Sequence, residues 1–321
     1  MLTTACLIKN NLVKSPFSKI RIGKEFDGGY VICPDFKYDC VLGCGISDDV
    51  SFENDLLNRI GKVPCYLFDG TIENIPVKRE EFTFIKKNIG EKETDFTTNL
   101  GDYMKEYRSI FLKMDIEGGE YDWFRFLDQD ESTRNLLDNV TQIVLEIHSL
   151  NVKNELAKSL LKLLFEYFYA IHIHGNNCCW FSTPEPDGCH FFNVFEITLL
   201  NKRCFNKIEF SNEEFPTSYD MKNTLHNQEL YLYTYPFYER IVRCDYDVYK
   251  ISPWNSVYND KFEFDIVKNS EGKRWLVVSR DHPWGQNLQV RMENVKNGNI
   301  KIIPCGVSNR NCTVYKLDND I

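Results

Sequence analysis

Residues 110–121 read Ile-Phe-Leu-Lys-Met-Asp-Ile-Glu-Gly-Gly-Glu-Tyr. The apolar run stops at two carboxylates, Asp115 and Glu117, and two glycines then lead to Glu120. This pattern is typical of a buried strand that ends in acidic groups and continues into a helix. Ligands of open α/β sheets bind at the carboxyl ends of the strands. We therefore predict an α/β fold with its site at this strand end. A carboxylate in the first turn of a helix suits the helix dipole, so we expect a structural role for Glu120.

Composition and charge narrow the class of protein. The 321 residues are 43% hydrophobic and 26% charged, as in an ordinary globular protein. The net charge of -9 argues against a nucleic-acid-binding surface. No apolar run reaches the length that a membrane-spanning helix needs, and the N-terminus does not resemble a secretory signal. The twelve cysteines lack the spacing of a disulfide framework, so we expect free thiols and a reducing, cytoplasmic location.

Six further apolar runs complete a predicted sheet of seven strands. With residues 110–114, the predicted strands are 39–42, 63–68, 82–85, 140–145, 169–174 and 192–200. Helices are expected between the first six strands, with amphipathic spacing at 51–60, 100–107, 120–127 and 156–168. A turn at Asp27-Gly28-Gly29 predicts a short hairpin before the sheet. We predict a Rossmann-like α/β domain over residues 1–235, with its core at about residues 21–201.

The first predicted strand leads into Gly43-x-Gly45, and a helix follows with Asp49 or Ser51 as its N-cap. Glycines in such a loop allow the backbone to approach a nucleotide closely. Asp69 ends the second strand, 24 residues after Gly45, where an acidic residue typically binds ribose hydroxyls. The alternative is that these residues only form turns. The third glycine of a dinucleotide fingerprint is absent, which argues against NAD.

The fifth strand continues into Glu146-Ile-His148, and residues two apart in a strand point to the same side. Glu146 and His148 are therefore expected to extend the acidic edge that begins at Asp115. His148 is the preferred general base, and His174 from the sixth strand is the second choice. Asp115, Glu146 and His148 also form a ligand set that suits Mg²⁺ or Mn²⁺. A zinc site is a further, disfavoured alternative, from His172, His174, Cys178, Cys179, Cys189 and His190.

Several of these motifs resemble the FkbM-like family of S-adenosylmethionine-dependent methyltransferases. The resemblance covers about residues 21–201 and is strongest at Asp115-Ile-Glu117-Gly118. It extends to Gly43-x-Gly45, Glu146-x-His148 and His174-x-Asn176-Asn177. The hairpin motif, residues 21–30, resembles a segment that helps to close the cofactor pocket in one branch of methyltransferase-like proteins. The acidic loop at residues 47–49 departs from the form common in the family.

The resemblance implies a seven-stranded methyltransferase sheet that binds S-adenosylmethionine and methylates a hydroxyl of a sugar, a glycan or another small molecule. The cofactor-binding residues are then Gly43, Gly45, Asp48, Asp69 and Asp115. The catalytic residues are His148, Glu117, Glu146 and His174. Acidic groups near the cofactor would favour its sulfonium cation.

Residues 236–321 have a different sequence pattern. Apolar and polar residues alternate at 262–266, 275–277, 288–292, 300–302 and 314–317, and Asn297-Gly298 is a hairpin turn signal. We predict a small antiparallel β module of unknown role. Its tryptophans suit either a core or a sugar-binding face.

Two other classes of function stay open. A non-catalytic protein could bind glycans or a partner on a methyltransferase-like scaffold. A nucleotide-sugar or NAD-dependent enzyme would share the sheet, but its Gly-x-Gly-x-x-Gly and Tyr-x-x-x-Lys motifs are absent from the expected positions.

Overall fold

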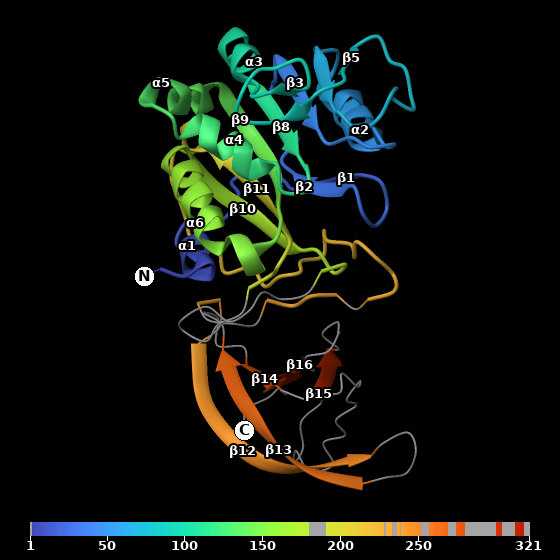
Figure 1. The fold of residues 1–321 in the computed structure, drawn as a ribbon. Coiled ribbons are helices and arrows are strands. Elements are labelled where there is room, and N and C mark those ends of the chain that lie inside the picture. The colour runs from blue at the N-terminus through green and yellow to red at the C-terminus, as the bar shows by residue number, and fades with distance from the viewer. Residues whose placement is uncertain are drawn as a thin grey trace.

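The computed structural model describes residues 2–179, 191–227, 229–232 and 236–237, and the backbone of five strands beyond them. Its centre is a mostly parallel sheet of seven strands in the order β5-β4-β3-β8-β9-β11-β10 (Figure 1). Every strand predicted for this sheet is present. The strands are β3 (Cys40–Cys44), β4 (Cys65–Phe68), β5 (Phe82–Ile85), β8 (Ile110–Met114), β9 (Val140–Ile147), β10 (Phe168–Gly175) and β11 (Phe195–Asn201).

Strand β11 lies between β9 and β10 and is antiparallel to both, whereas the other neighbours in the sheet are parallel. Parallel neighbours place their carboxyl ends at one edge. The structure thereby brings the ends of β3, β4, β8 and β9 together, where the predicted site residues lie.

Helices cover both faces of the sheet. They are α1 (Thr4–Lys9), α2 (Ser51–Ile60), α3 (Gly101–Glu106), α4 (Glu120–Leu127), α5 (Glu131–Arg134) and α6 (Leu150–Tyr167), with the 3₁₀ turns η1 (Asn135–Asn139) and η2 (Lys202–Cys204). Successive residues of a strand pack into two different hydrophobic cores, one on each face of the sheet. Leu112 packs with the residues beneath α4 and α6, and Phe111 packs with those beneath α2 and the hairpin. Period-two alternation between two apolar cores is what a sheet buried on both faces requires.

The predicted hairpin is present as β1 (Ile20–Gly23) and β2 (Gly29–Ile32). Two further short strands, β6 (Asn88–Ile89) and β7 (Thr97–Thr98), pair beside the main sheet. Two predictions were wrong. No helix joins β4 to β5, because residues 69–81 contain Pro76 and a charged run with no helical periodicity. The N-cap of α2 is Val50 rather than Asp49 or Ser51, although the Asp49 carboxylate accepts hydrogen bonds from the N–H and hydroxyl of Ser51.

The C-terminal strands form a separate antiparallel sheet in the order β12-β13-β14-β16-β15. They are β12 (Glu239–Ile251), β13 (Val257–Lys268), β14 (Arg274–Ser279), β15 (Ile300–Ile303) and β16 (Cys312–Leu317). Strand β12 was not predicted. The predicted strand at 288–292 and the turn at Asn297-Gly298 lie outside the described residues, and the domain boundary at residue 235 stays a prediction.

None of the helices in the described part of the chain has the length and apolar character needed to cross a bilayer. The eight cysteines whose side chains are described are all free, as expected; they are Cys6, Cys33, Cys40, Cys44, Cys65, Cys178, Cys179 and Cys204. The cytoplasmic location stays a prediction.

Gln142 ties the segment after the hairpin to the middle of the sheet. Its buried amide accepts a hydrogen bond from the Cys33 N–H at 2.9 Å and donates to the Cys33 carbonyl at 3.1 Å. The Gln142→Leu substitution would leave both backbone groups without these partners. We expect it to lower the free energy of unfolding by roughly 2–4 kcal/mol in urea denaturation.

The matched control is Gln129→Leu, because Gln129 is exposed at the end of α4. This change should alter the free energy of unfolding by less than about 0.5 kcal/mol. Equal effects at the two positions would contradict the role of Gln142.

Candidate active site

The loops after β3 and β8 touch at Gly45. Gly45 has a φ of +72°, and a Cβ built there would lie 1.7 Å from the carbonyl oxygen of Asp115. The contact is reinforced by hydrogen bonds: the Asp115 N–H donates to the Cys44 carbonyl at 3.1 Å, and Lys113 Nζ donates to the Gly45 carbonyl at 2.8 Å. A glycine is therefore required at position 45 by backbone conformation and by the approach of the neighbouring loop.

Gly43 has a different reason to lack a side chain. A Cβ at this position would lie 2.7 Å from Glu53 Oε1, in a space that the protein itself fills. Glu53 is buried, and burial raises the pKa of its carboxyl although nearby Lys113 opposes the shift. The predicted approach of the Gly43 backbone to a ligand stays a prediction. The structure adds a second reason for a glycine at this position, which is the room it leaves for Glu53 beneath the loop.

Asp69 holds the same loop from the end of β4. Its carboxylate accepts hydrogen bonds from the Ser47 N–H at 2.8 Å and from both the N–H and the hydroxyl of Thr71. Burial acts to raise the pKa of Asp69, but these hydrogen bonds outweigh it and the pKa is lowered. Asp69 is therefore a charged group that shapes the loop. Asp48, predicted beside it, is exposed.

His148 follows β9 and points its Nε2 atom at a group of carboxylates. This nitrogen lies 3.7 Å from Asp115 Oδ1, 4.0 Å from Glu146 Oε1 and 3.5 Å from Glu117 Oε2. His148 and Glu146 are buried, whereas Glu117 is exposed and has a φ of +54°. The predicted meeting of Asp115, Glu146 and His148 is thus present. Their ligand atoms lie within 4.8 Å of one another, a spacing that could also hold a metal ion.

The carboxylates control the charge of the imidazole. Burial alone would lower the pKa of His148, but Glu120, Glu146 and Asp115 raise it to about 9. Burial, with repulsion from Asp115 and Glu196, raises the pKa of Glu146 well above its usual value. Both His148 and Glu146 therefore hold a proton more tightly than the same side chains do in water.

Two residues of the cluster were not assigned by the sequence analysis. The Tyr30 hydroxyl from β2 donates to Asp115 Oδ2 at 2.8 Å, and the Asn176 amide donates to Glu146 Oε1 at 2.7 Å. Burial and the Asp115 charge raise the pKa of Tyr30 well above its usual value, so it stays a donor. Tyr30 belongs to the motif at residues 21–30 and Asn176 to His174-x-Asn176-Asn177, but no local pattern indicates a contact across such separations.

His174 lies in a second buried cluster on β10 and β11. Its Nδ1 is 3.4 Å from Glu196 Oε2, and its Nε2 is 3.2 Å from Glu229 Oε1. Burial would lower the pKa of His174, but these two carboxylates raise it well above its usual value. His172 pairs with Asp220 at 2.7 Å. The geometry gives no support to the zinc alternative within the described residues, and Cys189 and His190 lie outside them.

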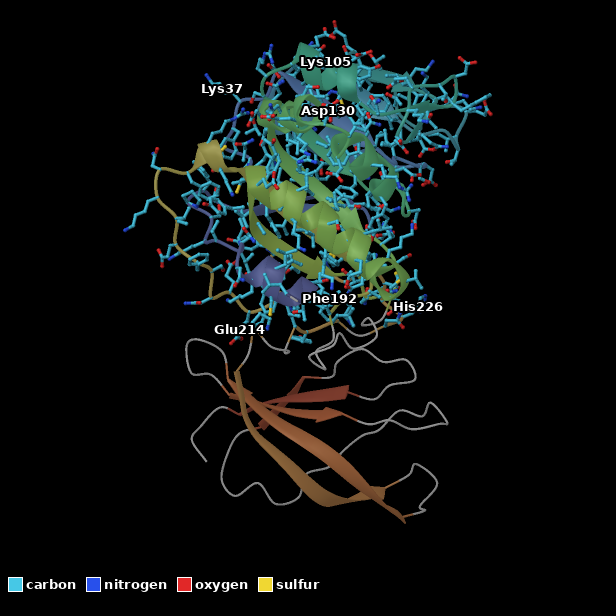
Figure 2. The ribbon with its side chains drawn as sticks, turned by 60° about the vertical axis from the view of Figure 1, so that its left-hand side comes forward. Lys37, Lys105, Asp130, Phe192, Glu214 and His226 are labelled. Carbon is cyan, nitrogen blue, oxygen red and sulfur yellow. The ribbon has the colours of Figure 1, made fainter. Side chains whose placement is uncertain are left out.

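The chain after β11 returns across this end of the sheet as a strap, residues 205–227 and 229–232. Asn177 holds this strap in place, because its side chain forms hydrogen bonds with the backbone of Thr224 and Asn227. Asn223 donates to Glu196 at 2.9 Å and to Asp27 of the hairpin loop at 3.3 Å. In Figure 2, Phe192 and His226 lie at this end of the domain, opposite Lys37 and Lys105.

The family model described as the Methyltransferase FkbM domain matches residues 19–171. This match confirms the resemblance predicted from the sequence, and it includes Gly43, Gly45, Asp69, Asp115, Glu117, Glu146 and His148. It ends within β10, so His174 and the C-terminal sheet lie beyond it. The chain matches no curated protein.

Gly45→Ala should disrupt the site because the added Cβ has no space beside the Asp115 carbonyl. Gly61→Ala is the matched control: Gly61 also has a positive φ, of +95°, but nothing lies within 4 Å of its Cβ position. Backbone strain of roughly 1–3 kcal/mol applies to both variants. We expect Gly45→Ala to lose clearly more unfolding free energy than Gly61→Ala in urea denaturation. Equal losses would show that the steric contact with Asp115 is unimportant.

Proposed function

We propose that the protein is an S-adenosylmethionine-dependent O-methyltransferase, because the family model described as the Methyltransferase FkbM domain matches residues 19–171. The acceptor is a hydroxyl of a sugar, a glycan or another small molecule. The observation that carries the proposal is the cluster of Asp115, Glu146 and His148, of which Glu146 and His148 are buried. The cluster lies directly beside the Gly45 loop. This juxtaposition puts a proton acceptor next to the place where sheets of this class bind a nucleotide.

The residues beside the loop fit the cofactor. S-adenosylmethionine would supply an electrophilic methyl group on a sulfonium cation. Asp69 stands at the strand end where adenosine ribose hydroxyls are usually bound, and its lowered pKa keeps it charged as an acceptor. Asp115 adds a partly exposed carboxylate at the next strand end. Negative charge at these two positions favours a cationic ligand over an anionic one.

We assign to His148 the role of the general base that removes the proton from the acceptor hydroxyl. A neutral imidazole accepts a hydroxyl proton through a free ring nitrogen, and Nε2 is the nitrogen that faces the cluster. Asp115 then stabilises the imidazolium that forms. Holding the acceptor oxygen in line with the methyl group can supply up to about 7–11 kcal/mol of the barrier. Glu117, exposed at the cluster, is placed to contact the acceptor. His174 becomes a support for Glu196 rather than a second base.

A divalent cation on Asp115, Glu146 and His148 is the alternative way to acidify the acceptor hydroxyl. The proton-transfer form is favoured because Glu146 already has the Asn176 amide as a partner and a raised pKa, which weakens it as an anionic ligand.

Two variants should distinguish cofactor binding from methyl transfer, because each is expected to impair mainly one of them. Asp69→Asn removes a carboxylate from the loop, and we expect it to weaken S-adenosylmethionine binding at least about tenfold in calorimetry. His148→Gln should keep cofactor binding and lose transfer by at least about 100-fold. Transfer is measured as a gain of about 14 Da by candidate acceptors, the mass of one added CH₂.

Asp95→Asn is the control for Asp69→Asn, since Asp95 is exposed in another loop. Wild-type protein that fails to bind S-adenosylmethionine at submillimolar concentration would refute the cofactor assignment. Cofactor binding without transfer to any hydroxyl-bearing acceptor would favour the non-catalytic binding protein instead.

The transfer rate should depend on pH through His148. Its pKa is raised from 6.5 to about 9, so the protonated form predominates at neutral pH and the base form appears as the pH rises. The single-turnover rate should therefore increase about tenfold per pH unit below pH about 9 and then level off. His148→Gln should flatten this profile. An apparent pKa near 6.5, or loss of wild-type transfer upon chelation with EDTA, would contradict the base role of His148.

A further inference from the structure

The first two residues of α4 hold both backbone polar groups of His148. The His148 N–H donates to Glu120 Oε1 at 2.9 Å, and the Tyr121 hydroxyl donates to the His148 carbonyl at 2.6 Å. Glu120 and Tyr121 are fully buried. His148 lies just beyond β9, where none of the described strands pairs with its backbone. Two consecutive side chains of a helix thus take the place of a sheet hydrogen-bond partner at this residue.

Glu120 also faces the imidazole ring. Its Oε1 atom lies 3.5 Å from His148 Nδ1. Among the described residues, neither Nδ1 nor the second oxygen of the Glu120 carboxylate has a hydrogen-bond partner. A carboxylate can only accept hydrogen bonds when ionised. It therefore favours a proton on Nδ1 and leaves the lone pair of the neutral ring on Nε2. Catalytic hydrogen bonds are often long before substrate binds, so 3.5 Å is compatible with such a pair.

Three other carboxylates lie near Nε2 and by the same rule attract a proton to that nitrogen. Two of them already accept a hydrogen bond from another side chain, and the third is exposed to water. Asp115 just after β8, Glu117 in the following loop and Glu146 on β9 all face Nε2. On α6, Lys153 lies over the Tyr121 ring, with its Nζ 4.6 Å from the ring centroid. In the part of the chain that the structure describes, Glu120 is thus the charged group that faces Nδ1.

A simple interaction with the helix dipole does not account for this placement. Asp122 lies in the same first turn of α4, is half-exposed, and can interact favourably with the dipole without burial. Glu120 instead turns inward to His148.

We propose that Glu120 and Tyr121 are positioning residues for His148, with Glu120 fixing the Nδ1–H tautomer so that Nε2 is the basic nitrogen. The arrangement has the logic of the buried aspartate in a Ser-His-Asp triad, which orients a histidine and sets its tautomer. This inference rests on the proposed base role of His148. It extends that proposal by assigning the third carboxylate of the 110–121 stretch to the chemistry.

Glu120→Gln is the discriminating substitution. Its carbonyl oxygen can still accept the His148 N–H, but its NH₂ group would donate to Nδ1 and favour the opposite tautomer. We expect kcat to fall at least about 100-fold, with the acceptor KM and S-adenosylmethionine affinity nearly unchanged. Tyr121→Phe should lower kcat less, because the Glu120 contact remains. The control is Asp122→Asn, two residues further along α4 and half-exposed, which should keep the wild-type kcat.

A second readout does not depend on activity. Nitrogen-15 NMR of labelled histidine reports the tautomer of His148, with its signals assigned by their loss in His148→Gln. At a pH above the ring pKa of about 9, wild type should carry its proton on Nδ1 and Glu120→Gln should carry it on Nε2. The same tautomer in both proteins, or a proton on Nε2 in wild type, would overturn the proposal. If wild type transfers no methyl group, the base role fails, and the NMR result still decides the tautomer.

Discussion

The contact between the ends of β3 and β8 is the constraint on which the site depends. The backbone of one loop occupies the space where any side chain at Gly45 would stand, so the two strand ends can adopt only one spacing. This spacing fixes the position of Asp115 at the end of β8. The Asp115 carboxylate in turn accepts the hydrogen bond of the Tyr30 hydroxyl. The turns that follow three strands carry residues with positive φ, at Ser47, Glu117 and Ser149. Such conformations cost free energy and cluster at functional sites, where well-packed strands on either side maintain them.

The second organising feature is a row of polar groups across the sheet. Register aligns Glu146 with Glu196, and Glu196 with His174, across β9, β11 and β10. Carboxylates placed side by side away from water repel one another, and the repulsion is relieved by protons and by amide donors such as Asn176 and Asn223. The row links the His148 cluster to the strap. A change of charge on one member therefore shifts the pKa of its neighbours in the row, as Glu196 does for Glu146.

The sequence was sufficient for the seven strands, since each is a short apolar run bounded by turn residues or charges. It also predicted that Asp115, Glu146 and His148 would meet, because strand ends of a parallel sheet share an edge. It did not reveal Tyr30 as the partner of Asp115, since that contact spans 85 positions and depends on how the hairpin packs. Glu120 was interpreted from its place in the helix alone. Its burial against His148 follows from the angle between α4 and β9, which no local pattern encodes.

The position of β11 has a consequence for how the chain folds as it is made. β10 is synthesised before β11, yet among the described strands of the sheet its neighbour is β11, which separates it from β9. Until residue 201 has left the ribosome, β9 has an open edge and β10 has no place in the sheet. An exposed edge of this kind invites pairing with other chains. The α/β unit can therefore close only after β11 inserts, some thirty residues beyond the end of the family match at residue 171.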